Sequence, residues 1–214
     1  MSEPTNPETH ISTEKSKYAD MVRGPYLSAI FNPDPDQFRQ MGDVAVHKFL
    51  DVGCGIDPRL SWGLGTGDLW IGCDPSATKG IVVKGERPVK RSAKLVIFPY
   101  QAEELAEKFP DLIPDVISII APNQEDVVKG RVFNEGLKKF LDPKKEQVLV
   151  IVLDTQTFEA EEYGEEAKQR IRSWRIENGF KPDTGNPVLD SFKLNSADTV
   201  VNNLKLCYVR NSKE

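Results

Sequence analysis

Two glycines and two acidic residues have the types and spacing that hold a nucleoside. Gly53 and Gly55 directly follow an apolar run that contains Asp51, and Asp74 ends a second apolar run 19 positions after Gly55. Because glycine has no Cβ, the backbone at such a turn can bend sharply and come close to a ligand. An acidic residue that ends the second strand is placed to accept hydrogen bonds from ribose hydroxyls. We interpret this stretch as a nucleoside-cofactor site.

The residues after Gly55 argue against a dinucleotide as that nucleoside. A dinucleotide site more often shows the pattern Gly-x-Gly-x-x-Gly, with a helix directly after it. Here Ile56, Asp57 and Pro58 follow instead. Asp57 and Pro58 have the types of an N-cap and a first-turn residue, so we expect a helix to begin there. The alternative is a strand, turn and helix without a ligand, in which the glycines serve packing only.

The elements that must position these residues alternate between strands and helices. Short, continuous apolar runs predict buried strands, and apolar residues at spacings of three and four predict helices between them. This alternation predicts an α/β fold with a doubly wound, mostly parallel sheet. Strands are predicted at 49–52, 69–73, 94–98, 113–121, 147–153, 188–195 and 204–210, and helices from 57, at 102–109, at 123–141 and at 160–179.

The pattern Asp-x-Gly-x-Gly at 51–55, followed by the strand-terminal Asp74, resembles that of the class I S-adenosylmethionine-dependent methyltransferases. The resemblance continues in Gln-Ala-Glu-Glu-Leu at 101–105, which is similar to the Asp-Ala-Glu-x-Leu segment of that family. It implies a Rossmann-like, seven-stranded sheet that ends in an antiparallel C-terminal hairpin. It also implies that S-adenosyl-L-methionine is the cofactor and that the chain is a methyltransferase.

The resemblance further implies which residues contact the cofactor. The amide oxygen of Gln101, in place of the usual Asp, would accept a hydrogen bond from the adenine amino group. The backbone N–H of Ala102 would meet a ring nitrogen. The alternative for Gln101 is a polar residue at a helix N-terminus. The complete implied cofactor set is Asp51, Gly53, Gly55, Asp74, Gln101, Ala102, Ala121 and Arg23.

The acceptor side of the site follows the fourth and fifth strands. Asn123 comes just after the fourth strand, where the family faces the transferring methyl group, and is the only candidate for a catalytic residue. The order Ala-Pro-Asn departs from the family's Asn/Asp-Pro-Pro-aromatic box, and Asn123 is also placed to cap the following helix. Asp154, after the fifth strand, and Tyr18, near the N-terminus, complete the expected substrate contacts.

The N-terminal part divides into a polar tail at 1–16 and a predicted helical cap at 17–42, ahead of the cofactor-binding domain at 43–214. Apolar residues from Tyr18 to Phe31 recur at helical spacing, and Gly24-Pro25 divides them into two short helices. A third short helix is expected from Asp36. The segment is expected either to cover the active site, with Arg23 and Tyr18 facing the ligands, or to pack on a sheet edge.

Composition narrows the class of protein. The chain has 214 residues and a net charge of −5, which argues against a nucleic-acid partner. The basic stretch 84–94 is either a nucleic-acid patch or, as we prefer, a solvated loop. No run approaches the roughly 20 apolar residues that span a bilayer, and we expect a cytoplasmic protein with free thiols. Neither histidine belongs to a catalytic cluster, and no metal site is expected.

Three functions remain open at this level. The leading one is methyl transfer to a small-molecule acceptor, and the first alternative is methylation of a tRNA or other RNA base. The second alternative is a non-catalytic Rossmann-like binding module. Sequence does not identify the acceptor, its reacting atom or the oligomeric state, because substrate contacts in this fold come from loops that follow no general code.

Overall fold

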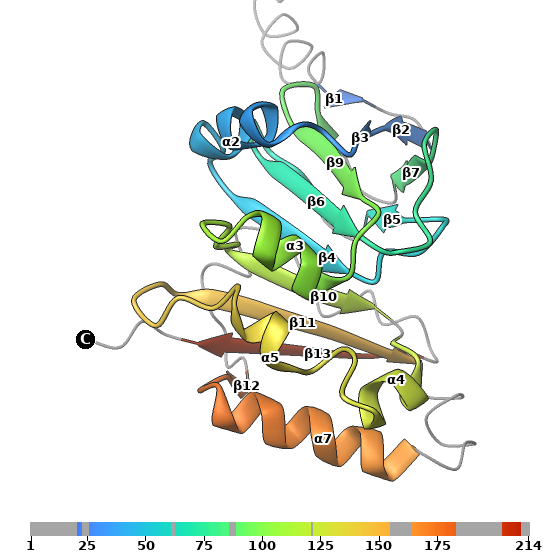
Figure 1. The fold of residues 1–214 in the computed structure, drawn as a ribbon, viewed down its shortest axis with the longest axis vertical. Coiled ribbons are helices and arrows are strands. Elements are labelled where there is room, and N and C mark those ends of the chain that lie inside the picture. Colours follow the sequence, from blue (N-terminus) through green and yellow to red (C-terminus); the bar gives the residue numbers. More distant parts are fainter. Residues whose placement is uncertain are drawn as a thin grey trace, which may run out of the picture.

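The computed structural model describes residues 21–22, 26–60, 63–85, 89–120, 122–154, 164–182 and 203–210. Eight of the described strands form a central sheet of order β12-β13-β11-β10-β4-β6-β9-β3, seen in Figure 1. The five central parallel strands are β4 (Lys48–Val52), β6 (Leu69–Cys73), β9 (Lys94–Phe98), β10 (Val116–Ile120) and β11 (Gln147–Asp154).

The predicted doubly wound, mostly parallel topology is confirmed. Among the five central strands the chain begins at β4, adds β6 and β9 on one side, and then adds β10 and β11 on the other. β13 (Asn203–Arg210) runs antiparallel to β11, as predicted for the last strand. On its other side β13 pairs with β12 (Lys181–Pro182), also antiparallel. The strand predicted at 188–195 lies outside the described residues. The eighth strand, β3 (Ile30–Phe31), joins β9 in parallel.

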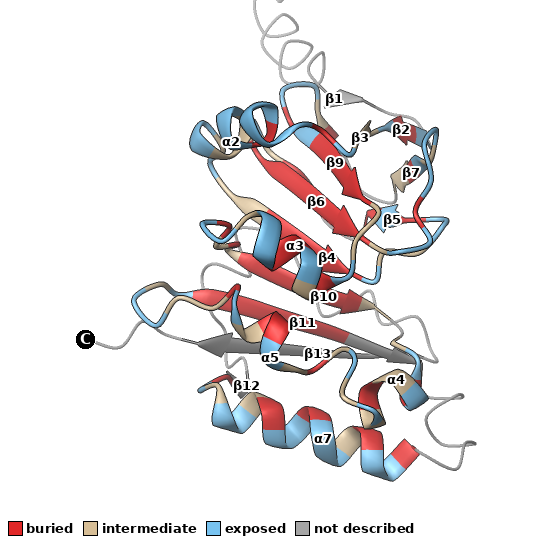
Figure 2. Ribbon diagram, viewed as in Figure 1, coloured by how far each residue is buried: buried red, intermediate tan, exposed pale blue. Residues whose placement is uncertain are grey.

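Five helices contribute to a core on one face of this sheet (Figure 2). Phe38 is the buried residue of helix α2 (Pro35–Asp43). Its ring meets the Phe98 ring of β9 edge-on, with 5.0 Å between the ring centroids. The helix predicted at 123–141 is two short helices, and Gly130 between them has a left-handed φ of 69°. The five are α2 (Pro35–Asp43), α3 (Ala102–Lys108), α4 (Gln124–Val128), α5 (Glu135–Lys138) and α7 (Gly164–Glu177).

A three-stranded sheet packs at the second core, in the place where a helix was expected. It has the order β2 (Tyr26–Ser28), β7 (Val82–Gly85), β5 (Arg59–Leu60). Its buried side chains Leu27, Val83 and Leu60 join Phe49 and Trp70 of the central sheet in this core.

The prediction that a helix begins at Asp57 and Pro58 is therefore wrong. Those residues lead into β5, and the described residues between β4 and β6 contain no helix. The Pro58 carbonyl accepts a hydrogen bond of 2.8 Å from the Lys84 N–H, and the following residues pair with β7. Pairing with a strand that is distant in sequence has overridden the local capping signal.

The two helices predicted between Tyr18 and Phe31 are also corrected. β1 (Met21–Val22) pairs with β8 (Val89–Lys90), β2 pairs with β7, and β3 pairs with β9. In β2 the exposed, buried, exposed pattern has the period of two that a half-buried strand requires. The helix expected from Asp36 is confirmed as α2. The tail at 1–16 lies outside the described residues, and the domain boundaries remain predictions.

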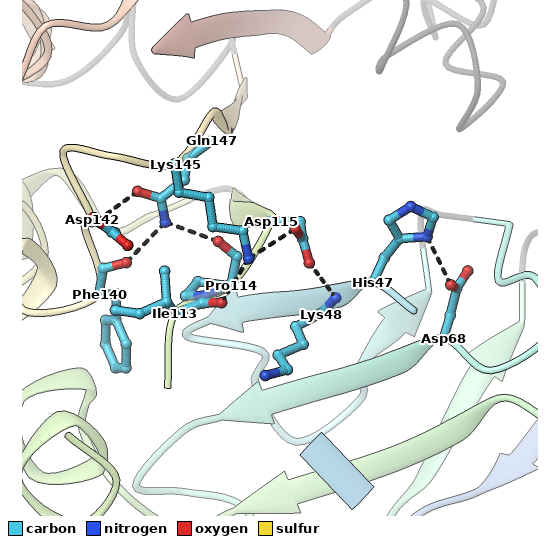
Figure 3. Close-up of polar contacts among 10 residues, drawn as sticks. All are labelled: His47, Lys48, Asp68, Ile113, Pro114, Asp115, Phe140, Asp142, Lys145 and Gln147. Atoms are coloured by element: carbon cyan, nitrogen blue, oxygen red, sulfur yellow. Dashed lines mark hydrogen bonds and ion pairs between the residues drawn. The ribbon is translucent and has the colours of Figure 1, made fainter. Parts of the chain in front are cut away.

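Polar contacts join the amino ends of the central strands (Figure 3). Asp115 accepts a 2.7 Å hydrogen bond from the Lys48 N–H and lies 2.9 Å from the Lys145 ammonium. The fully buried Gln147 donates to the carbonyls of Pro114 and Phe140, at 2.8 and 2.9 Å. These groups satisfy one another, so this edge is structural, and the residues with predicted chemistry lie at the carboxyl ends.

Within the described part of the chain, no helix combines enough length with enough apolar character to cross a bilayer.

Candidate functional site

The glycine turn folds back over the end of the neighbouring strand. The N–H groups of Gly53 and Cys54 both donate to the Cys73 carbonyl, at 2.9 and 3.3 Å. Gly53 and Gly55 have φ values of 70° and 74°, in the left-handed region that side chains with a Cβ disfavour. The backbone conformation of the turn therefore requires glycine at both positions. The turn lies against the end of β6, so that the carboxyl ends of β4 and β6 are neighbours.

Asp74 is brought directly onto this turn. One carboxylate oxygen accepts a 3.0 Å hydrogen bond from the Gly55 N–H. The other accepts a 2.7 Å bond from the Ser76 N–H and a further bond from the Ser76 hydroxyl. A carboxylate has about four acceptor positions, so at least one is left for a ligand hydroxyl. The sequence predicted that Asp74 and Gly55 belong to one site, but it did not reveal Ser76.

Asp51 lies beneath the turn with only 3% of its surface exposed. Its carboxyl accepts a 2.9 Å hydrogen bond from the hydroxyl of Ser118, which is its register partner on β10. Burial raises the pKa of Asp51 to about 7, and the Ser118 bond opposes part of that rise. Sequence reasoning missed Ser118, although a single hydroxyl inside the apolar run of β10 was the available signal.

Two free cysteines lie at the turn: Cys54 stands between the two glycines, and Cys73 is the last residue of β6. Burial raises the pKa of Cys73 to about 12 and raises that of Cys54 further, with the nearby Asp51 and Asp74 carboxyls adding to the effect. Both thiols are therefore neutral near pH 7 and are not nucleophiles. A Cβ on Gly72 would lie 2.9 Å from the Cys54 sulfur, so this glycine makes room for the thiol.

Gln101 and Ala102 stand where the end of the third parallel strand meets a helix. Asp74 is held beside this junction, because its N–H donates to the Phe98 carbonyl at 3.1 Å. Gln101 occupies the N-cap position of α3, is exposed, and makes no side-chain capping bond. The structure thus confirms its place at the helix N-terminus and leaves its amide facing solvent, while Ala102 begins the helix and is buried.

Asn123 is confirmed as a helix cap. Its side-chain oxygen accepts hydrogen bonds from the N–H groups of Glu125, at 2.9 Å, and Asp126, at 3.4 Å. The oxygen is therefore engaged in capping α4, and a substrate contact would use the amide NH₂.

The Asn123 cap leads to a stability prediction. We expect Asn123→Ala to lower the free energy of unfolding by about 1 kcal/mol, because two helix N–H groups lose their acceptor. Asn123→Asp keeps the acceptor oxygen and serves as the matched control. Urea denaturation measures both, and equal stabilities of the alanine variant and the wild type would contradict the capping role.

The remaining predicted site residues are only partly placed. Tyr18, Arg23 and Ala121 lie outside the described residues. Asp154 is the last residue of β11, where its backbone pairs with Asn203. The assignments of ligand contacts therefore stay predictions. Within the described ranges, no group of three or more His, Cys, Asp or Glu side chains is arranged to hold a metal ion.

No family model matches the chain, and no curated protein matches it. Several solved structures are similar in overall path. The aminoglycoside resistance methyltransferase NpmB1 has 15% identity and a TM-score of 0.47, with 89% of this chain and 98% of that chain covered.

Two further solved structures show the same level of similarity. The 16S rRNA (adenine(1408)-N(1))-methyltransferase from Catenulisporales acidiphilia has 16% identity and a TM-score of 0.45, covering 91% and 99% of the two chains. The 16S rRNA methyltransferase KamB has 14% identity and a TM-score of 0.47, covering 86% and 98%. Identities and scores of this size say nothing about the activity or substrate of the present chain.

The fold follows from the strand order of the chain itself. A central strand that leads into the glycine turn, two strands added on one side and two on the other, and a final antiparallel strand beside the fifth are all present. This arrangement is the class I methyltransferase-like fold.

Proposed function

We propose that this chain is a methyltransferase that uses S-adenosyl-L-methionine. The observation that carries the proposal is the hydrogen bond from Gly55 to Asp74 at the carboxyl ends of β4 and β6. This turn lies beside the point where the sheet reverses its winding, between β4 and β10. Open α/β sheets bind their ligands at such a point.

The residues of the turn have complementary roles toward that cofactor. Asp74 would hold the ribose hydroxyls, and Gln101 with the Ala102 N–H would hold the adenine edge. A sulfonium and an ammonium group near the glycine turn would favour the ionised form of the buried Asp51 carboxyl, whose pKa is otherwise raised to about 7. The cofactor supplies a methyl group that is already activated for transfer.

The chain itself then needs to align and shield the reacting groups. Methyl transfer is accelerated mainly by holding the donor and the acceptor in line and by excluding water. The neutral thiols of Cys54 and Cys73 take no part in proton transfer at pH 7. Positioning by the turn and by the loops after β9 and β10 is therefore the proposed source of catalysis.

RNA is the acceptor class that we place ahead of a small molecule. The net charge of −5 favoured the small molecule, but that charge is a sum over the whole chain. The exposed face of the three-stranded sheet carries Tyr26 with Arg59 and Lys84, and it begins within a few residues of the glycine turn. A local combination of aromatic and basic side chains suits nucleic acid whatever the total charge.

The proposed function is tested by calorimetry followed by an activity assay. We expect the folded protein to bind S-adenosylmethionine and S-adenosylhomocysteine at one site per chain. Transfer of a radiolabelled methyl group to total RNA, compared with transfer to a small-molecule extract, identifies the acceptor class. Absence of binding to either nucleoside by a folded sample would leave the non-catalytic module as the function.

A further inference from the structure

The three-stranded sheet has one buried face and one face toward solvent. Leu27, Val83 and Leu60 point into the second core. The alternate residues of each strand point the other way, because successive side chains of a strand lie on opposite faces. This outer face consists of Tyr26, Ser28, Val82, Lys84 and Arg59.

Three of these residues form a row across the strands. Lys84 is the register partner of Tyr26 on one side and of Arg59 on the other. Neighbouring strands lie about 4.8 Å apart, so the ring and the two cationic side chains stand next to one another. Tyr26 is 62% exposed. Neither Arg59 nor Lys84 forms an ion pair with a carboxylate in the described part of the chain.

The row is connected directly to the proposed cofactor site. β5 follows the glycine turn, and β7 follows the loop that begins at Asp74. The hydrogen bond between the Lys84 N–H and the Pro58 carbonyl, 2.8 Å long, joins the two connections. In Figure 1 the small sheet lies by the arrowheads of β6 and β9, at the carboxyl ends of the central strands. A polymer on this face would therefore have neighbouring residues within reach of the turn.

The shape and charge of the row select the kind of partner. Small ligands bind in concave sites that enclose most of their surface, and the outer face of a short sheet offers no such enclosure. A pocket among the described residues lies at the other end of the central strands, between α2 and the end of α3. A second copy of the chain on this face would bring like charges together across a two-fold axis.

We propose that this outer face docks single-stranded RNA, with a base stacked on Tyr26 and phosphates held by Lys84 and Arg59. The proposal rests on the methyltransferase function above and names the class of acceptor for that site. Stacking on an aromatic ring and charge pairing with the backbone are the two interactions that single-stranded nucleic acid provides at every nucleotide. A duplex cannot offer its stacked bases to the ring, so the face should prefer single strands.

Fluorescence anisotropy with a labelled oligouridylate and a labelled RNA duplex tests the docking face. Tyr26→Ala is expected to weaken binding of the single strand about tenfold, whereas Tyr26→Phe keeps the ring and should bind as the wild type does. The double variant Arg59→Ala/Lys84→Ala should reduce the slope of log affinity against log salt by about 1.4, because each lost phosphate contact contributes about 0.7.

Matched controls separate the face from general electrostatics. Lys144→Ala/Arg172→Ala removes one lysine and one arginine that are exposed and lie far from the small sheet in sequence. We expect this pair to leave affinity and salt slope unchanged. An equal loss in both double variants would overturn the docking face. All the substituted side chains are exposed or partly exposed, so each variant is expected to fold. Circular dichroism checks this.

The remaining outcomes distinguish this inference from the proposed function. A protein that binds S-adenosylmethionine but no single-stranded RNA at low salt retains the function and loses the docking face. A dimer in sedimentation that Tyr26→Ala dissociates would make the face a self-association surface and also overturn the inference. RNA binding with the expected variant pattern, but without cofactor binding, supports the face and rejects the methyltransferase.

Discussion

The free energy of unfolding is expected to fall by up to about 4 kcal/mol as the pH rises from about 4 to 7, because of Asp51 alone. Burial raises its folded-state pKa from 3.8 to about 7. Between those values the folded state keeps a proton that the unfolded state has released, so raising the pH favours unfolding. The contribution is fully present below the unfolded pKa and is lost as the pH passes through the folded one.

Asp51→Asn is the variant that tests this expectation. The amide keeps the shape and an acceptor for the Ser118 hydroxyl but cannot ionise, so most of the pH dependence should disappear. Urea denaturation of both proteins at a series of pH values measures the difference. Asp111→Asn, at an exposed carboxylate, is the control and should reproduce the wild-type profile. A wild-type profile that is flat between pH 4 and 7 would show that Asp51 is not buried as described.

The second large effect is expected for Asp74→Ala, which should raise the dissociation constant for S-adenosylmethionine about 100-fold. Hydrogen bonds to a charged carboxylate contribute about 1.5–3 kcal/mol each. Loss of the ribose contacts removes about that amount, and the Gly55 and Ser76 N–H groups lose their acceptor as well. About 3 kcal/mol corresponds to 100-fold in affinity. Calorimetry with S-adenosylmethionine and S-adenosylhomocysteine measures the change.

The control for Asp74 is Ser76→Ala. It removes one hydroxyl bond to the carboxylate and leaves both backbone bonds in place. We expect a change of at most a few-fold, with the same order of affinities for the two ligands. If Asp74→Ala bound both ligands as tightly as the wild type while remaining folded, the ribose would not be held at the end of β6.

Much of the fold was predictable because buried parallel strands need continuous apolar runs. The strand predicted at 94–98 is β9 without a change of boundary, and the helix before Gly179 ends near that glycine, which has a φ of 76°. The pairing of Asp74 with the glycine turn was predictable for a related reason. The carboxyl ends of neighbouring parallel strands meet at one edge of a sheet, so residues just after two such strands come together.

The N-terminal segment could not be predicted in the same way. The apolar residues between Tyr26 and Phe31 fit a helical spacing, and so short a stretch also fits the alternation of a strand. The choice was made by partners far along the chain, since β2 pairs with β7 and β3 with β9. A short strand is stabilised by these ladder hydrogen bonds and by burial of one face, neither of which is visible in the local sequence.

The sequence by itself determined which segments form the parallel strands. It also determined the glycine turn and the acidic residue that meets this turn. Only the tertiary structure decided that Ser118 bonds to Asp51, that Ser76 shares the Asp74 carboxylate, and that Arg59 and Lys84 align with Tyr26. The first group depends on local turns and on burial, which composition and periodicity record. In the second group, the Ser76 bond depends on the local conformation of the loop after β6. The Ser118 bond and the row with Tyr26 depend on register between strands that are distant in the chain, and register is set by the packing of whole faces.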